Sequence, residues 1–354
     1  MGGILAMRRL TCSAVVLAVV GGTAWGGAAP ARAQEITLKL HHFLGPTAPA
    51  QRDFFEPWAK RVEEQSNGRI KIQIYPSMTL GGSPPQLISQ LRDGVVDIIW
   101  TLPSYTAGQF PRTEVFELPF VHTNDAVATN LAIEDLYDEW LAQEYQDIHP
   151  ILLHVHAGNA LHTIDKPVRT PEDLRGLKIR TPSRTGSFML EALGANPVGM
   201  PVPQLPQALS KHVVDGTTIP YEVSLPLKIH ELVKYHMEFE DGTRLGTSVF
   251  LFGMNKARYE SLPDDLKAVI DQNSGANIAA EIGKVWMDAE EPGRQAAIEA
   301  GNEFIDWPNA DKPKWQAAVQ PAIDRWLAEM QDAGIDGQAL LAAARAAVEA
   351  HSDH

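Results

Sequence analysis

The chain has 354 residues, 44% of them hydrophobic, and a formal net charge of −14. This length suggests two domains with a sizeable core, and the acidic balance argues against nucleic acids and anionic lipid surfaces as partners, because both need a basic surface. The only cysteine is Cys12, so the later chain has no thiol for a disulfide, a cysteine-ligated zinc site or a nucleophile.

The first 33 residues have the three parts of a secretory signal peptide. Arg8 and Arg9 form a positive start, residues 10–20 are mostly apolar, and Ala-Arg-Ala at 31–33 is a cleavage site of the A-x-A type. The apolar run is too short to span a membrane, and no later run is long enough. We therefore expect export, by the general secretory route rather than the twin-arginine route, and a mature chain with 27 basic and 44 acidic residues, net −17.

The first half of the mature chain alternates predicted strands and helices. Apolar and polar residues follow a period of two in some segments and a helical period in others. Strands are predicted at residues 36–40, 70–75, 95–100 and 151–156, and helices at about 47–66, after 84 and at 126–145.

Residues 174–222 repeat the pattern of the first half. Gly176 precedes an alternating strand at 177–181, as Gly68 precedes the strand at 70–75, and Val-Val-Asp follows a helix in both copies. Two similar strand–helix–strand units indicate two similar α/β lobes, each a mixed sheet flanked by helices. A ligand is expected between them, because domain interfaces are favoured pocket sites.

Beyond residue 245 the sequence becomes mostly helical. A strand is predicted at 248–254, then a long helix at 264–304 kinked at Pro292 and spanning both lobes, and two further helices at 315–333 and 338–351. We expect lobe I to hold residues 34–157 plus about 246–287. Lobe II then holds residues 158–245 plus about 288–354.

Arg180 is the foremost candidate for ligand binding. It lies at the carboxyl end of the 177–181 strand, just before Pro182, and α/β sheets bind ligands at this edge. The planar guanidinium suits a carboxylate, with two parallel hydrogen bonds. By position alone, a surface salt bridge explains Arg180 equally well.

Other candidates come from strand ends and the loops that follow them. Aromatic rings there could stack on a ligand, although each could also be part of the core. Asn159 and His162 could donate hydrogen bonds to ligand oxygens, and Arg184 could assist Arg180 or only stabilise its loop. The aromatic candidates are Phe43, Trp100, Tyr105 and Tyr221.

Catalytic and metal-binding motifs are missing from the sequence. It contains no G-x-S-x-G, G-x-G-x-x-G, P-loop or H-E-x-x-H pattern. His154 and His156 share one face of a predicted strand but have no third ligand at a known spacing, so a core pair is favoured over a metal site. We expect no enzyme activity, no metal and no cofactor.

Several segments together resemble one family of binding proteins. They are Gly-Arg-Ile-Lys-Ile-Gln-Ile-Tyr-Pro (68–76), Gln-Leu-Arg-Asp-Gly-Val-Val-Asp-Ile (90–98), Phe-Glu-Leu-Pro-Phe-Val (116–121), Leu-Arg-Gly-Leu-Lys-Ile-Arg-Thr-Pro (174–182), Leu-Gly-Ala-Asn-Pro-Val (193–198) and Val-Val-Asp-Gly (213–216). Their order and spacing resemble the DctP-like solute-binding proteins of tripartite ATP-independent periplasmic (TRAP) transporters, over nearly the whole mature chain. The resemblance implies a two-lobed periplasmic binding protein that delivers a small organic acid to the transporter's membrane subunits. It also implies that Arg180 holds the ligand carboxylate.

The sequence departs from the sialic-acid binders of this family at two positions. Those proteins carry a second arginine in the segment matching residues 158–163, where this chain has Asn159 and His162, and an asparagine where it has Ile219. A sugar acid would leave unmatched hydroxyl groups at about 1–3 kcal/mol each. An aromatic or apolar monocarboxylate is therefore favoured, lying against Phe43, Trp100, Tyr105, Ile219 and Tyr221.

Several alternatives remain open at this point. A C4 dicarboxylate or an aliphatic 2-oxo acid is the second choice of ligand. A sensor with the same ligand chemistry, or an exported enzyme acting on small acids, is the alternative function. The exact ligand, any bound cation and the oligomeric state do not follow from the sequence.

Overall fold

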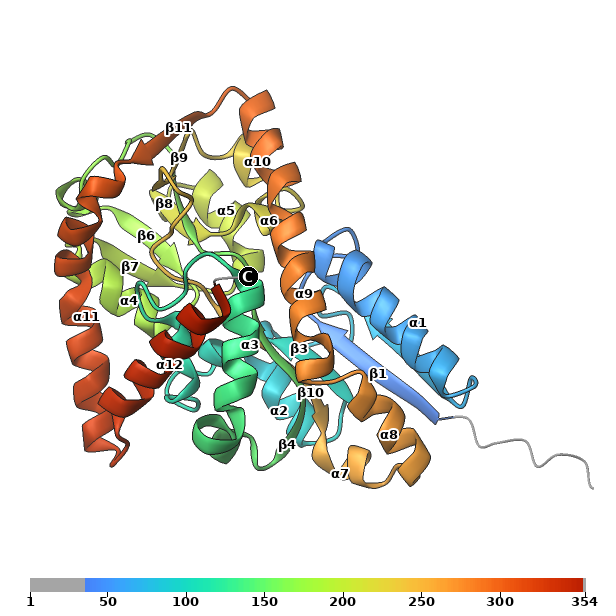
Figure 1. Ribbon diagram of the computed structural model, residues 1–354. Helices are drawn as coiled ribbons and strands as arrows, with labels where there is room; N and C mark the ends of the chain where they lie inside the picture. Colours follow the sequence, from blue (N-terminus) through green and yellow to red (C-terminus); the bar gives the residue numbers. More distant parts are fainter. Residues whose placement is uncertain (1–35, 353–354) are drawn as a thin grey trace, which may run out of the picture. The chain divides into compact units, whose positions relative to one another are not determined.

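The structure is a computed structural model that describes residues 36–352, so the predicted signal peptide and its cleavage site lie outside the described residues. Two separate sheets organise the described residues (Figure 1). Within residues 36–352, no helix has the length and apolar character needed to cross a membrane.

The first sheet has five strands in the order β2-β1-β3-β10-β4. It is mixed, because β1 pairs in parallel with β2 and β3 whereas β10 pairs antiparallel with β3 and β4. Its strands are β1 (Ile36–His42), β2 (Ile70–Tyr75), β3 (Ile98–Thr101), β4 (Ile148–Val155) and β10 (Val249–Asn255). Helices α1 (Glu56–Gln65), α2 (Leu87–Arg92) and α3 (Ala126–Leu136) contact β2, β3 and β4 respectively.

The second sheet has six strands in the order β11-β9-β5-β8-β6-β7 and is also mixed. Its strands are β5 (Ala160–Thr163), β6 (Lys178–Thr181), β7 (Asn196–Gly199), β8 (Gly216–Ile219), β9 (Tyr235–Phe239) and β11 (Glu303–Trp307). The helices in this part of the chain are α4 (Arg184–Ala192), α5 (Leu205–Ser210), α6 (Tyr221–Ser224) and α11 (Lys312–Asp332). The predicted fold class, two mixed sheets flanked by helices, is confirmed.

Both alternating segments and continuous apolar runs led to correct strand predictions, since the predicted strands at 151–156 and 248–254 correspond to β4 and β10. The strand at 70–75 is confirmed, and its pattern has Ile70 and Ile72 buried and Lys71 and Gln73 exposed. The predicted strand at 95–100 begins only at Ile98, because Val95 is 54% exposed and belongs to the preceding turn. Strands β5, β7, β9 and β11 were not predicted. All residues of β5 and β9 are buried, so neither strand shows the alternation of a half-exposed strand.

The predicted long helix at 264–304 is wrong in its length. It consists of α8 (Asp264–Gln272), α9 (Ala276–Asp288) and α10 (Glu290–Glu299), and strand β11 follows. The helix is interrupted at residues 273–275 and at Ala289 rather than at Pro292. Pro292 is tolerated because it lies in the first turn of α10, where the backbone N–H groups have no partner within the helix. Helix α9 contacts α3 and β4, and α10 contacts α6, so the pair does reach from one sheet to the other (Figure 1).

Two glycines bring α9 and α10 close to their neighbours. A Cβ atom added at Gly283 would lie 2.7 Å from the Cα atom of Val127 in α3. One added at Gly293 would lie 2.0 Å from the carbonyl oxygen of Tyr221 in α6. Both distances are shorter than carbon atoms tolerate, so any side chain at these positions would push the helices apart.

The C-terminal helix α12 (Gly337–Ser352) packs against α3. His351 Nε2 lies 2.7 Å from a carboxylate oxygen of Asp135, and the Ser352 hydroxyl lies 3.2 Å from that of Thr123. The predicted boundaries place residues 288–354 in lobe II, whereas α12 lies with the helices of the first sheet. The division into lobes stays a prediction.

Helix α7 (Lys256–Glu260) follows β10 directly.

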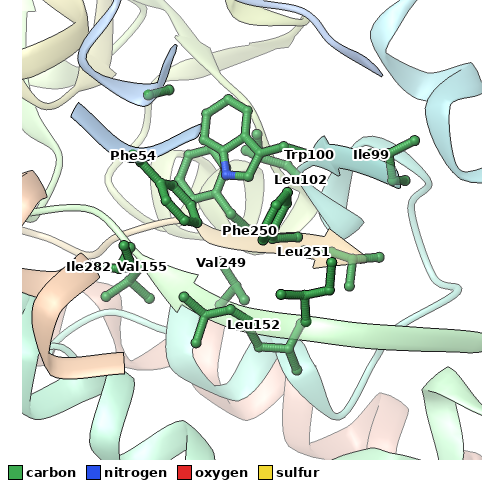
Figure 2. Packing of buried hydrophobic residues seen from close by; sticks show 14 of the residues in the cluster. Phe54, Ile99, Trp100, Leu102, Leu152, Val155, Val249, Phe250, Leu251 and Ile282 are labelled. Atoms are coloured by element: carbon green, nitrogen blue, oxygen red, sulfur yellow. The ribbon is translucent and has the colours of Figure 1, made fainter. Parts of the chain in front are cut away.

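Large aromatic side chains fill the core beside the first sheet. Figure 2 shows Phe54, Trp100 and Phe250 gathered in this core. The Trp100 and Phe250 rings are stacked with centroids 4.5 Å apart, and Trp286 of α9 stacks on Trp100 at 5.9 Å. This aromatic stack extends to the edge of the sheet, where it forms one wall of a cavity.

Candidate ligand-binding site

A pocket with about 350 Å³ of empty space, part of it open to solvent, is lined by residues from the segments of both sheets. Most of its lining is apolar: Phe43, Leu44, Trp100, Leu102, Pro182, Val202, Ile219, Pro220, Val223 and Phe250. The remaining lining residues are Tyr105, His156, Asn159, Arg180, Glu222 and Ser248. Such a site suits a small, mostly apolar ligand with one or two polar groups.

Arg180 provides the positive charge of this cavity. Strand β6 places it level with Thr217 of β8, and its side chain is only 1% exposed. Its Nε and Nη2 atoms donate to the carbonyl oxygen of Met200 at 3.0 and 2.8 Å. Among residues 36–352, no carboxylate forms an ion pair with it. Burial lowers the pKa of Arg180, yet a guanidinium stays charged at neutral pH, so the cavity holds a buried cation that an anion would stabilise.

Aromatic rings form the wall contributed by the first sheet. Phe43 stacks on Trp100 with centroids 5.0 Å apart and an interplanar angle of 20°, and Tyr105 meets Phe43 edge-on at 5.7 Å. The Tyr105 hydroxyl accepts a hydrogen bond from the Val202 N–H at 3.0 Å, which joins the two sides of the cavity. These contacts give the cavity a flat, largely apolar wall.

A buried histidine holds the Trp100 ring in place. Trp100 Nε1 donates to His154 Nε2 at 2.9 Å, and burial lowers the pKa of His154 to about 3. His154 is therefore neutral at physiological pH and can accept this bond. In the part of the chain that the structure describes, no group of three or more His, Cys, Asp or Glu residues is placed to hold a metal ion.

The structure brings six of the nine predicted site residues to the cavity and leaves three outside its lining. His162 lies in the second sheet, where its ring nitrogens contact His236 Nδ1 at 2.6 Å and the Ile219 carbonyl oxygen at 3.0 Å. Tyr221 is buried beside the His162 and His236 rings, 5.2 and 5.6 Å away. Those at the cavity are Phe43, Trp100, Tyr105, Asn159, Arg180 and Ile219.

Arg184, the third residue outside the lining, forms ion pairs instead. Its Nε and Nη2 atoms donate to the two carboxylate oxygens of Glu114, both at 2.6 Å, and Nη1 donates to Glu329 of α11. These two carboxylates occupy all three nitrogen atoms of the Arg184 guanidinium. In this structure Arg184 therefore stabilises the helix packing around α4, which is the other role considered for it.

Three polar side chains reach the cavity with hydrogen-bonding capacity left over. The side-chain amide group of Asn159 makes no hydrogen bond within residues 36–352. Glu222 Oε2 and Ser248 Oγ are buried and have no partner in the same range. Burial, and then the nearby Glu290, raise the pKa of Glu222 well above its ordinary value. Glu222 and Ser248 were not predicted, although Glu222 follows a strand end by three residues and could have been noticed by that position.

A second buried carboxyl group lies near the cavity without lining it. Glu117, at the end of the short helix η4 (Thr113–Glu117), accepts hydrogen bonds from the Val249 N–H at 3.0 Å and the Thr185 hydroxyl at 3.1 Å. It thus connects β10 of the first sheet to α4, which packs beside the second. Burial raises the pKa of Glu117 to about 7.

We expect Glu117→Gln to gain stability relative to the unsubstituted protein as the pH rises from 5 to 8. The folded protein keeps the Glu117 proton up to about pH 7, whereas the unfolded chain releases it near its ordinary pKa. This group's favourable contribution is therefore complete below that ordinary pKa and is lost as the pH rises through 7. Melting temperatures of both proteins across this range test it, with Glu349→Gln as an exposed control. A constant difference between variant and parent would contradict the expectation.

The chain matches the family model DctP, described as bacterial extracellular solute-binding protein, family 7, over residues 40–330. It is 43% identical to a TRAP solute-binding protein from Rhodoferax ferrireducens T118, crystallised with copurified benzoate, with a TM-score of 0.87 and coverage of 90% of this chain and 98% of that one. A marine metagenome TRAP solute-binding protein, described as specific for aromatic acid ligands and crystallised with 3-hydroxybenzoate, is 41% identical, with a TM-score of 0.88 and coverage of 90% and 100%.

A more distant relative has a different named ligand. The C4-dicarboxylate-binding periplasmic protein DctP from Rhodobacter capsulatus is 25% identical over 311 residues, which are 87% of this chain and 92% of that protein. The match to the family model and both structural neighbours confirm the family resemblance and the two-sheet fold. This chain belongs to the DctP family of bacterial extracellular solute-binding proteins, the binding proteins of TRAP transporters.

Proposed function

We propose that this protein captures an aromatic monocarboxylate in the periplasm and delivers it to the membrane subunits of a TRAP transporter. The observation that carries the proposal is the buried Arg180, without a carboxylate partner in the described chain, in a cavity walled by stacked Phe43 and Trp100. The ligand carboxylate pairs with the guanidinium, and the ring lies against the apolar wall. Burying the ring contributes roughly 2–3 kcal/mol from area, and stacking geometry about 0.5–1.5 kcal/mol more.

The composition of the cavity favours one carboxylate over two. Arg180 is the only lysine or arginine among the residues that line it, and the lining also includes the acidic Glu222. A dicarboxylate would bury a second negative charge without a cation, which is costly. Benzoate and 3-hydroxybenzoate, bound by two relatives above 40% identity, each carry one carboxylate. Both observations support an aromatic monocarboxylate over the C4 dicarboxylate of the more distant relative.

The cavity offers little support for catalysis. Ser248 is the lining serine, and its hydroxyl oxygen makes no hydrogen bond to a base within the described residues. A serine nucleophile needs an adjacent general base to become reactive. The family is one of binding proteins, and capture followed by release to a permease is the function that this site favours.

Ligand binding is proposed to close two lobes, because the cavity lining comes from both sheets. A ligand that contacts both walls binds the closed state better and so shifts the population towards it. Small-angle scattering with saturating ligand should then show a smaller radius of gyration. An unchanged radius with confirmed binding would exclude a large closure.

A thermal-shift panel tests the ligand class directly. Benzoate, the three hydroxybenzoates, phenylacetate and mandelate are compared with succinate, pyruvate and glucuronate. Aromatic monocarboxylates are expected to raise the melting temperature, because a ligand that binds only the folded state stabilises it by mass action. Shifts with succinate or glucuronate and none with the aromatic acids would overturn the proposed function.

A further inference from the structure

Glu222 is a polar group of the cavity that the proposed function leaves without a role. It lies in α6, immediately after the Pro220–Tyr221 link from β8, and its backbone N–H donates to Glu290 Oε1 at 2.9 Å. Its side chain is 3% exposed, and Oε2 has no hydrogen-bond partner within residues 36–352. Arg180 and the aromatic wall together account for the carboxylate and the ring of a ligand, but they do not account for this acid.

A buried carboxyl oxygen without a partner is unfavourable, and native proteins rarely leave one unsatisfied. Asn159 and Ser248 do not satisfy it, because neither is hydrogen-bonded to Glu222. Arg180 is level with Thr217 of β8, whereas Glu222 is five residues further along the chain, beyond the end of β8. Both residues line the cavity, Arg180 from β6 and Glu222 from α6.

Resting on the proposed function, we propose that Glu222 is a specificity-determining residue that hydrogen-bonds a ring hydroxyl of the ligand, so that the protein prefers hydroxylated aromatic acids to unsubstituted ones. A phenolic hydroxyl both donates and accepts, and a protonated carboxyl group does the same. Burial and the neighbouring Glu290 raise the pKa of Glu222, which favours its protonated form. A neutral Glu222 also avoids repulsion with the carboxylate held by Arg180.

The experiment measures a ratio of affinities rather than a single affinity. Titration calorimetry compares benzoate with 2-, 3- and 4-hydroxybenzoate for the unsubstituted protein, Glu222→Gln and Glu222→Met. We expect at least one hydroxybenzoate to bind the unsubstituted protein about tenfold more tightly than benzoate, the size of one well-made hydrogen bond. Glu222→Gln, which keeps a neutral donor and acceptor, should retain this preference. Glu222→Met, similar in length but apolar, should reduce the ratio to about one, whereas the exposed Glu231→Met should leave it unchanged.

The outcomes separate this inference from the proposed function. Equal affinities for benzoate and all three hydroxybenzoates in the unsubstituted protein would overturn the inference and leave the proposed function standing. A preference that persists in Glu222→Met would do the same. If Glu222→Gln no longer preferred hydroxybenzoate to benzoate, the proposal that a neutral Glu222 hydrogen-bonds the ring hydroxyl would be overturned. If no aromatic acid binds the unsubstituted protein, the proposed function fails and this inference fails with it. The ratio in the unsubstituted protein needs no variant, so the test survives a variant that does not fold.

Discussion

Arg180→Lys is expected to weaken binding of the best aromatic acid from about 30-fold to several thousand-fold. Losing one partner of a buried, hydrogen-bonded charge pair costs about 2–5 kcal/mol. The lysine ammonium carries the same charge but lacks the planar fork that makes two parallel bonds to a carboxylate. Arg180 also uses Nε and Nη2 to hold the Met200 carbonyl oxygen, and a lysine cannot keep that contact and the ligand in the same geometry. Titration calorimetry on the purified variant measures the loss.

Arg184→Lys is the matched control for this experiment. Arg184 lies four residues away and outside the cavity lining, and its fork is bound to Glu114. We expect a lower melting temperature and nearly unchanged affinity for this variant. Near-normal affinity in Arg180→Lys, or an equal loss of affinity in both variants, would show that Arg180 does not hold the ligand carboxylate.

Arg244→Met should destabilise the protein by about 3–5 kcal/mol, the cost of removing one partner from a buried charge network. Arg244 is 6% exposed, and its guanidinium donates to Glu238 at 2.7 Å, to Glu290 at 2.5 Å and to the Gly158 carbonyl oxygen at 2.6 Å. Methionine matches its stem but leaves both carboxylates without this partner. Because burial already raises the pKa of Glu290, that group can take up a proton in the variant, which limits the loss.

Denaturant unfolding of the variant measures this loss as a free energy. Lys284→Met serves as the control, since Lys284 pairs with Asp288 on an exposed helix face and such pairs are worth about 0.5 kcal/mol or less. A loss below about 1 kcal/mol in Arg244→Met would contradict the prediction. It would mean that the carboxylates find other partners when the guanidinium is removed.

The fold could be predicted from the sequence where one face of an element meets solvent, or where a long apolar run marks a buried strand such as β10. The alternation in β2 and the helical spacing of Phe54, Trp58 and Val62 record such a half-exposed environment. Strand β5 is buried throughout, so its Ala-Leu-His-Thr sequence carries no alternation. Strand β7 contains Pro197 and lies at the edge of its sheet, where proline is tolerated. Local pattern cannot reveal either strand, because neighbouring strands determine both.

The site could be predicted only in part, for a similar reason. The position of Arg180 at a strand end made it a candidate, and the family resemblance favoured it over a surface salt bridge. Whether His162 meets a ligand or His236 depends on strand β9, which is far away in the chain and was not predicted. Phe250 looks like any core residue of a buried strand, and only the fold shows that it lies at the cavity edge. The sequence thus identifies candidate groups, and tertiary packing decides which of them share a site.

The close contacts of Gly283 and Gly293 hold α9 and α10 against two different helices, one on each side of the break between them. Helix α9 lies against α3, α10 lies against α6, and Ala289 separates the two helices. Because α9 has 13 residues, it is roughly 20 Å long. A bend of about 10° at Ala289 therefore moves its far end by roughly 3 Å, about two residues of helical rise. A bend of this size would move the contact between α9 and α3 relative to the contact between α10 and α6.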